Sequence, residues 1–598
     1  MSVIKVIMGV LICIALLMFA VGLSINAILN SSSGAFPLKI NKYPKPRINE
    51  MAWPTIGFPS IKTPGSILTV ELDLGGVGRD TRGSIRSSNC RAVLNPVRKA
   101  LKWLEYVIPA RSVKRGRSKH WPVDSRMGRI DDLFHIDFKL PSDILPELYD
   151  LKVMVTLGGQ TLSDFEPHCV SVIEGGKDFF RFVTIADVHV HRRNISGWMQ
   201  PQTNKGITAS GKPAFFNNAI EQVNLIRPEF VIMLGDYVRA QHRPGDLIIE
   251  FENFYNALLS FEVPVFLVPG NHDLYVNEID GSKLWRENLG PLYYSFSIMN
   301  CHFSCVNTSD WPFQDRNVMK KLGLFVYPRK WQGQILGAEN EKDPRTYSGQ
   351  LAWLRDDLEN SKEKLKFLFC HHDPYRPEGR GVSFDNETFA LFFRLGGGGR
   401  GRRALLELCS RYHVNFVFSG HLHSDYVGVR KWRKSKNSTV FANQTCLYFD
   451  EGGKRRKYPG YRIVEVRAGH ARVLYYAKKP WSLPFYAGSV PGGTTSLDSL
   501  HLPSLSGYWR NSHVNHSLEF VVESRLGAKI EIKGIVCCFN RIVDNPKVRG
   551  ASVEKVFTLP EAKRTVLYLK TRVAGPPLRE CLGKYNYHSE RIVISVGD

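Results

Sequence analysis

The feature that most constrains this fold is a regular alternation of short apolar runs and helical segments between residues 178 and 479. Five apolar runs have the length and composition of buried strands: 182–186 (FVTIA), 230–234 (FVIML), 265–268 (VFLV), 365–370 (LKFLFC) and 414–419 (VNFVFS). Segments with helical spacing separate them, at 215–226, 247–261, 351–361 and 402–412. Because the strands are apolar at consecutive positions, we expect helices to cover both faces of the sheet. The pattern predicts a central α/β domain over residues 178–479.

Polar side chains follow each of these runs at the point where the strand ends. They are Asp187 and His189, Asp236, Asn271 and His272, His371 and His372, and His421 and His423. In open α/β sheets, ligands gather outside the carboxyl ends of the strands. We therefore expect these side chains, which are distant in sequence, to meet in one pocket.

The residue types at these strand ends are those that bind metal ions. Asp187 and His189 are two residues apart, so in a continuing strand both would point the same way and could reach one ion. His421 and His423 repeat this spacing. The carboxylates, the carboxamide and the imidazoles together exceed what one tetrahedral ion takes. They suit two ions that share Asp236, and two ions about 3.5–4 Å apart clamp a phosphoryl group and activate the attacking water.

The ordered set DVH…GD…GNHD…HHDP…GHLH resembles the calcineurin-like metallophosphoesterases over roughly residues 178–479. The resemblance implies an α/β sandwich of two β-sheets flanked by helices, with a dinuclear metal centre. The metal ligands it implies are Asp187, His189 and His423 for the first ion, Asn271, His372 and His421 for the second, and Asp236 for both. The family usually places its ligand two residues before the proline of HHDP, which is His372, and His371 is the alternative.

The resemblance also implies roles for two residues that bind no metal. His272 matches the family's histidine that stabilises the transition state or protonates the leaving oxygen, and Asp273 would orient its ring, as carboxylates do for other imidazoles. Purple acid phosphatases carry an iron-binding Tyr three residues after the shared Asp, where this chain has Arg239. We therefore expect two divalent or trivalent metal ions (Mn, Fe, Zn or Ni) and no iron–tyrosinate centre.

The N-terminus carries an uncharged apolar run from Val6 to Leu23, preceded by Lys5. A cleaved signal peptide has an apolar region of roughly 7–15 residues, whereas a membrane span needs about 20. We therefore expect residues 1–30 to form a single-pass transmembrane helix in the cell membrane, with the catalytic domain outside the cytoplasm. The alternative is a cleaved signal peptide and a secreted protein.

Composition and strand-like alternation predict the remaining parts of the chain. Residues 31–64 are a tether rich in Pro and Ser, and residues 65–176 form an N-terminal β-sandwich of immunoglobulin or fibronectin type. Residues 480–506 are rich in Pro, Gly and Ser and form a linker, and residues 507–598 form a C-terminal β-domain. The expected fold class is thus multidomain, with the α/β sandwich between two β-sandwich-like domains.

The formal charge of +24 permits anionic partners. We expect a phosphorylated anionic substrate and do not favour nucleic acid, because genomic DNA is not available to an exported protein. The expected function is metal-dependent hydrolysis of phosphate esters, with phosphomonoesters or nucleotides favoured. The alternatives are a phosphodiesterase or nuclease on the same fold, and a non-catalytic cell-surface protein with a structural metal site.

Overall fold

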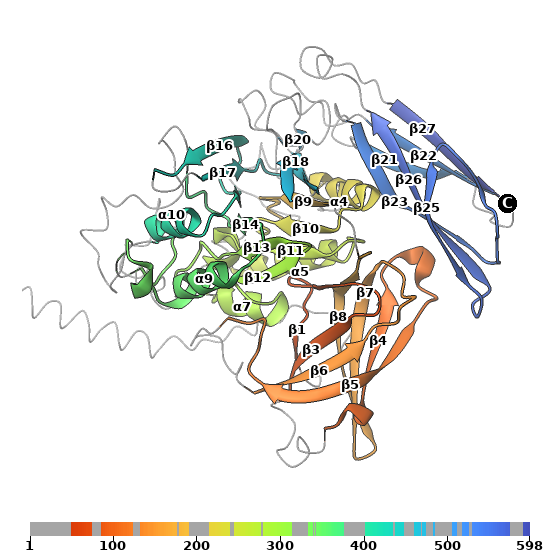
Figure 1. Cartoon of the computed structure of the whole chain (residues 1–598), viewed down its shortest axis with the longest axis horizontal. Coiled ribbons are helices and arrows are strands. Elements are labelled where there is room, and N and C mark those ends of the chain that lie inside the picture. The colour runs from red at the N-terminus through yellow and green to blue at the C-terminus, as the bar shows by residue number, and fades with distance from the viewer. Residues whose placement is uncertain are drawn as a thin grey trace, which may run out of the picture.

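The computed structural model covers the central region and most of both flanking regions (Figure 1). The described residues are 50–74, 85–122, 132–175, 179–190, 214–239, 244–276, 279–313, 333–338, 340, 342–375, 401–433, 437–447, 460–467, 469–473, 482–484, 505–510, 517–524, 529–574 and 590–597. The predicted membrane anchor at 1–30, like the first part of the tether, lies outside them. Within the described part of the chain, no helix has the length and apolar character that a membrane crossing requires.

The central region contains two mixed β-sheets. The first has the order β11-β10-β9-β18-β19, with β20 paired to β18, and the second has the order β12-β13-β14-β15-β17-β16. The strands of the first sheet are β9 (Phe179–Ile185), β10 (Phe230–Met233), β11 (Val265–Leu267), β18 (Gly460–Arg467), β19 (His470–Val473) and β20 (Leu483–Pro484). Those of the second are β12 (Tyr294–Ile298), β13 (Cys301–Cys305), β14 (Leu365–Phe369), β15 (Phe416–Ser419), β16 (Tyr426–Lys431) and β17 (Ser438–Asn443).

An aromatic core lies between the two sheets. Phe182 and Phe230 of the first sheet stack with ring centres 5.2 Å apart, and Phe303 and Phe367 of the second stack at 5.0 Å. The Phe182 ring also meets the Phe367 ring edge-on at 5.6 Å. All four side chains are fully buried, so the predicted two-sheet α/β sandwich is confirmed.

Helices cover the outer faces of this sandwich. Those packed on the first sheet are α4 (Ala214–Ile226), α5 (Pro244–Leu258), α6 (Asn271–Leu274) and α7 (Gly281–Asn288). Those packed on the second are α9 (Gly349–Asn360) and α10 (Arg402–Arg411), near the short helix η5 (Pro344–Thr346). Strands buried under helices on one face and under the second sheet on the other need apolar residues on both faces, which explains their composition.

The N-terminal region forms one eight-stranded sheet of order β1-β3-β6-β5-β4-β7-β8-β2 around its own core. Its elements are β1 (Glu50–Trp53), β2 (Ser60–Lys62), β3 (Ile67–Asp73), η1 (Ser87–Asn89), β4 (Cys90–Pro96), η2 (Lys99–Leu101), β5 (Tyr106–Gly116), β6 (Leu133–Lys139), β7 (Leu148–Leu157) and β8 (Gln160–Val172). The sheet therefore takes in residues 50–62, which the sequence assigned to the tether. Between β1 and β2, Gly57 accepts a hydrogen bond from the Leu267 backbone of β11 at 2.9 Å.

The C-terminal region contains two further sheets, with orders β21-β22-β27-β24 and β23-β26-β25. Their strands are β21 (Leu505–Arg510), β22 (Ser517–Ser524), β23 (Lys529–Phe539), β24 (Lys547–Arg549), β25 (Ser552–Leu559), β26 (Arg564–Ala574) and β27 (Glu590–Gly597). Buried residues of these strands belong to the same apolar cluster as α4 and α5. In Figure 1 the N-terminal (orange) and C-terminal (blue) strands lie on the same side of the central region.

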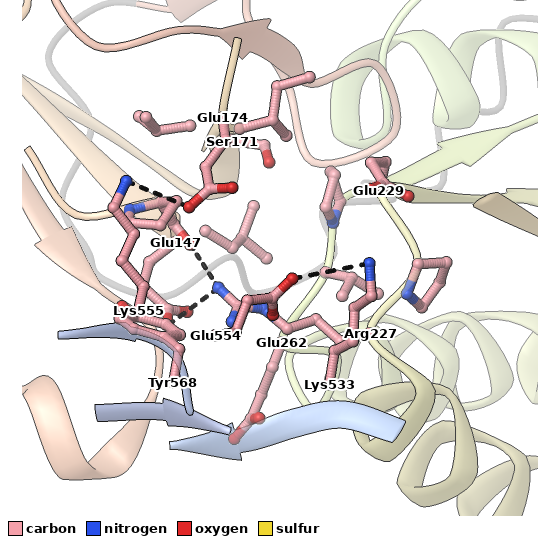
Figure 2. Close-up of a pocket in the computed structure, with 17 residues that line it drawn as sticks. Glu147, Ser171, Glu174, Arg227, Glu229, Glu262, Lys533, Glu554, Lys555 and Tyr568 are labelled. Carbon is pink, nitrogen blue, oxygen red and sulfur yellow. Dashed lines mark hydrogen bonds and ion pairs between the residues drawn. The ribbon is translucent and has the colours of Figure 1, made fainter. Parts of the chain in front are cut away.

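All three regions meet around Glu147, a buried residue of the N-terminal region. Its carboxylate accepts hydrogen bonds from Arg98 at 3.2 Å and from Arg227 of the central region at 3.3 Å. Arg98 also pairs with Glu262 of the central region at 2.5 Å. The Arg227 guanidinium lies 4.7 Å from the ring centre of Tyr568 in the C-terminal region. Figure 2 shows Glu147, Arg227, Glu262 and Tyr568 around a pocket where the regions meet. The ion pairs of Glu147 and Glu262 join the N-terminal and central regions, and the Arg227–Tyr568 contact adds the C-terminal region.

Candidate metal centre

The side chains that follow the strands converge at one edge of the sandwich, in two clusters. Cluster A consists of donor atoms from Asp187, His189, Asp236 and His423. His423 Nε2 lies 3.1 Å from His189 Nε2 and 3.4 Å from Asp187 Oδ1. Asp236 Oδ2 lies 3.8 Å from His189 Nε2. Donor atoms of Asp187, His189 and His423 thus lie within 4.8 Å of one another, and Asp236 adjoins them through His189.

Cluster B consists of donor atoms from Asp236, Asn271, His371 and His421. His371 Nε2 lies at its centre, 3.1 Å from Asn271 Oδ1, 3.2 Å from Asp236 Oδ2 and 3.2 Å from His421 Nδ1. Asp236 Oδ2 therefore belongs to both clusters, as expected for a ligand shared by two ions.

The spacing and chemistry of both clusters fit bound cations. Around a six-coordinate ion with bonds of about 2.1 Å, neighbouring donor atoms lie about 3.0 Å apart, which is close to the 3.1–3.2 Å of cluster B, while the distances in cluster A run from 3.1 to 3.8 Å. The contact between the Nε2 atoms of His189 and His423 joins two nitrogens that are both acceptors when they bind metal. Carboxylate, carboxamide and imidazole donors suit several transition metals. The residues present therefore fit two metal ions.

The electrostatics of His189, His421 and Asp236 agree with this interpretation, whereas at His371 the effect of burial is outweighed by the adjacent Asp236 carboxylate, which raises the pKa to about 9. Burial lowers the pKa of His189 and His421 well below the usual value, so both rings are neutral, as a metal ligand must be. Burial alone would raise the pKa of Asp236, but the adjacent His371 and His272 rings hold it well below the usual value. Asp236 is therefore an anion that is 2% exposed to solvent.

Five of these residues have a left-handed backbone, with φ of 54° at Asp187, 41° at His189, 57° at Asp236, 69° at His421 and 48° at His423. The spacing of Asp187 and His189 predicted that both continue their strand, but β9 ends at Ile185. Their side chains meet through a strained turn instead, a feature that concentrates at functional sites.

Two glycines let the turns approach one another. A Cβ on Gly270 would lie 2.3 Å from the Asp236 backbone nitrogen, and a Cβ on Gly420 would lie 2.7 Å from Asp187 Oδ2. Both distances are shorter than any real contact, so both turns need a residue without a side chain.

Asp273 has a different role from the one the sequence predicted. Its carboxylate accepts backbone N–H bonds from Asp236 at 2.9 Å, Tyr237 at 2.8 Å and Gly270 at 2.8 Å. Asp273 therefore does not orient the His272 ring. It ties the turn that carries Asp236 to the turn that begins α6.

The backbone carbonyl of Arg239 orients His272. It accepts a hydrogen bond from His272 Nδ1 at 3.2 Å. The His272 ring lies edge-on to the His189 ring, with centres 4.7 Å apart, and the His272 backbone N–H donates to Asp236 Oδ1 at 2.8 Å. His272 thus stands at the edge of cluster A with Nε2 as its remaining ring nitrogen.

The distances favour His371 over His372 as the ligand in cluster B. His371 Nδ1 donates to the Leu234 carbonyl at 2.7 Å, which leaves the lone pair of Nε2 directed at cluster B. The His372 ring instead lies against Thr308, with Nδ1 2.9 Å from Oγ1. The Thr308 hydroxyl also accepts the His372 backbone N–H at 3.0 Å. His372 nevertheless belongs to one group with His371 and His421, whose possible donor atoms lie within 4.8 Å of one another, so both histidines stay candidates and the shorter contacts favour His371.

Sequence reasoning missed three residues that support the clusters. Thr308 follows a strand that carries no ligand motif, so nothing in the sequence pointed to it. Arg462 and Asp425 form a buried ion pair beside the His421–His423 turn. An arginine in the apolar run YRIVEV of β18 was a visible signal for this pair, since a charge there must find a partner.

Comparisons with known proteins agree with the motif set. Residues 180–425 match the family model described as calcineurin-like phosphoesterase. That region is a calcineurin-like phosphoesterase domain. Strand β18 lies beyond the matched range but pairs with β9 along its length, so this chain's phosphoesterase domain extends past it.

Two curated relatives match at low identity. A protein of Arcobacter nitrofigilis named probable glycerophosphodiester phosphodiesterase GpdQ is 22% identical over 42% of this chain and 74% of its own length. A protein of Coxiella burnetii named probable cyclic nucleotide phosphodiesterase CBUA0032 is 24% identical over 39% of this chain and 75% of its own length. The domain and these names support a hydrolase that acts on phosphate esters.

Two solved structures are similar to this chain at low scores. The purple acid phosphatase PPD1 of yellow lupin has a TM-score of 0.36 at 13% identity and covers 68% of each chain. A dimetal phosphatase of Danio rerio has a TM-score of 0.34 at 15% identity, over 50% of this chain and 99% of that one.

Proposed function

We propose that this protein hydrolyses phosphodiesters with a dinuclear metal centre. Asp187, His189 and His423 would hold one ion and Asn271, His371 and His421 the other, with Asp236 shared; the identity of the metals is open. The observation that carries the proposal is the position of Asp236 Oδ2, which lies near donor atoms of both clusters. One oxygen between two sets of donors has the arrangement that a two-ion phosphoryl-transfer site needs.

The two clusters and His272 would then perform different parts of the reaction. Two ions held in the clusters would act as Lewis acids that offset the charge developing on the phosphoryl oxygens. The Arg239 carbonyl accepts the Nδ1 proton of His272 in a hydrogen bond, so Nε2 is the atom that would give a proton to the leaving oxygen. Burial lowers the pKa of His272, which favours release of that proton.

The choice of a diester differs from the sequence-based preference for monoesters. Both curated relatives carry phosphodiesterase names, and that supports a diester substrate for this chain. The loops expected to cap the pocket, chiefly 192–212, 310–348 and 379–403, lie wholly or partly outside the described residues. Monoester hydrolysis is the second candidate.

A paired chromogenic assay tests the proposal. Protein stripped with a chelator is reloaded with Mn²⁺, Zn²⁺ or Fe²⁺ and given bis(4-nitrophenyl) phosphate or 4-nitrophenyl phosphate. We expect metal-dependent turnover with the higher kcat/KM on the diester. A higher kcat/KM on the monoester would reverse the substrate class, and no turnover with any metal would reject the reaction.

Two variants distinguish loss of the metal site from general loss of folding. Asp236→Asn should abolish turnover of both substrates, because it removes the shared anion. His302→Ala should retain turnover, since His302 is a buried histidine that pairs with Asp357 at 2.8 Å and belongs to neither cluster.

We further propose that residues 1–30 anchor the protein in the cell membrane with the phosphoesterase domain outside the cytoplasm. The apolar run from Val6 to Leu23 supports this location. Membrane fractionation of full-length protein, with protease protection of the domain in intact cells, tests it. Release of the whole chain into the medium would indicate a cleaved signal peptide instead.

A further inference from the structure

A charged side chain lies between the two central sheets at the metal end of the sandwich. Arg462 is on β18, where side chains alternate between the two faces of the sheet. Val464 and Val466 on the same face belong to the aromatic core between the sheets. Arg462 therefore extends that face toward the clusters, and it is fully buried.

The partners of Arg462 come from the second sheet. Its guanidinium forms an ion pair with Asp425 and donates to the Asn443 carbonyl at 2.9 Å. Asp425 is also fully buried and follows His423 by two residues. The pair thus links β18 of the first sheet to the turn of the second sheet that carries two candidate ligands.

A third segment completes this group. Ser482 directs both its backbone N–H and its hydroxyl to the Asp425 carboxylate, the hydroxyl at 3.0 Å. Ser482 is fully buried and immediately precedes β20, the short strand paired with β18. The sequence assigned it to the linker after the phosphoesterase domain, but its contacts are with that domain.

The turn held by this group is strained. His421 and His423 both have positive φ, at 69° and 48°, and non-glycine residues keep such a backbone only where the surroundings enforce it. Asn443 Nδ2 donates to the Ser424 carbonyl at 2.6 Å. The next residue, Asp425, is held by Arg462 and Ser482. The Asp425–Arg462 pair is thus one of the constraints that enforce the turn.

We propose that Arg462 and Asp425, tied by Ser482, are positioning residues that set the geometry of both metal positions. The inference rests on the two-ion site proposed above. His423 belongs to cluster A and His421 to cluster B, so one turn supplies a ligand to each. Loss of the pair lets the turn relax and weakens both positions together, whereas loss of any one unshared ligand weakens chiefly its own.

The test compares metal binding by the apo protein across variants. Arg462→Met, Asp425→Asn, the double variant and Ser482→Ala are titrated with Co²⁺, which reports ligand geometry through its visible spectrum. Removing partners outside the metal's own ligands typically costs about 10- to 100-fold in affinity. We expect a loss of that size at both positions with an altered spectrum for Arg462→Met, and a smaller loss for Ser482→Ala.

The control is Arg98→Met, which breaks another buried Arg–carboxylate pair, Arg98–Glu147, at the junction of the three regions. It should lower the melting temperature of the apo protein and leave Co²⁺ affinity and spectrum unchanged. Parental affinity and spectrum in Asp425→Asn and Ser482→Ala would overturn the inference, even if Arg462→Met fails to fold. If the parent protein itself binds no Co²⁺, the two-ion proposal fails first, so the two failures are distinguishable.

Discussion

Two adjacent histidines give the sharpest test of the metal centre, because both have possible donor atoms near His421, whereas the contacts of 3.1–3.2 Å in cluster B belong to His371. His371→Ala and His372→Ala remove the same side chain one residue apart, and both positions are fully buried. The expected outcomes differ, since His371 Nε2 lies 3.1–3.2 Å from three donor atoms, whereas His372 Nδ1 lies against Thr308.

The size of the difference follows from these contacts. Removing a residue outside the metal's own ligands costs about 10- to 100-fold in metal affinity, so the loss of affinity in His372→Ala should lie near 10-fold. Removing a direct ligand should cost more than about 100-fold. His371→Ala should therefore weaken one of the two metal positions by about 100-fold or more, or roughly 3 kcal/mol.

The assay is metal stoichiometry and affinity, measured by titration of the apo protein and by elemental analysis after dialysis. We expect His371→Ala to retain one equivalent of metal and His372→Ala to retain two. His302→Ala, a buried histidine remote from both clusters, controls for the cavity that the substitution leaves. Two tightly bound equivalents in His371→Ala, with one lost in His372→Ala, would refute the assignment.

Three further substitutions test separate parts of the structure. His272→Gln should reduce kcat by about 10²–10⁴-fold, the usual contribution of general acid–base catalysis, with the metal content unchanged by elemental analysis. Gly270→Ala should reduce kcat/KM about 100-fold, because its Cβ displaces Asp236 and misplacement by 1 Å costs about that much; Gly245→Ala, where a Cβ meets open space, should not. Glu147→Gln should destabilise the protein by about 3–5 kcal/mol in chemical unfolding, as expected when a buried ion pair loses one partner, without changing metal affinity.

The parts of the fold that the sequence predicted are those encoded by local pattern. The apolar runs at 182–186, 230–234, 265–268, 365–370 and 414–419 correspond to β9, β10, β11, β14 and β15, and the predicted helices correspond to α4, α5, α9 and α10. A strand buried on both faces needs consecutive apolar residues wherever it lies in the chain. The convergence of the polar strand ends followed from the same reasoning.

The errors came from contacts between distant segments. Residues 50–62 have the composition of a tether, yet β1 and β2 pair with β3 and β8, and such partners are not visible locally. Spacing from a proline could not decide between His371 and His372, because the direction of the His371 ring depends on the Leu234 carbonyl 137 residues away. Asp273 seemed suited to orient His272 because it is adjacent, but its carboxylate binds backbone N–H groups of other turns.

The backbone conformation of this site was not predicted by any sequence pattern. Five candidate ligands adopt positive φ, at a cost of order 1–3 kcal/mol each for such backbone strain. Hydrogen bonds between the turns offset this strain, since Asp187 N–H donates to the Gly235 carbonyl at 3.1 Å and His189 N–H donates to the Asp236 carbonyl at 3.0 Å. The Asp187 carboxylate in turn accepts the His421 N–H at 3.0 Å. Because each strained turn is held by its neighbour, the donor atoms are brought together by the fold itself, and the geometry of the two clusters is a property of the folded chain.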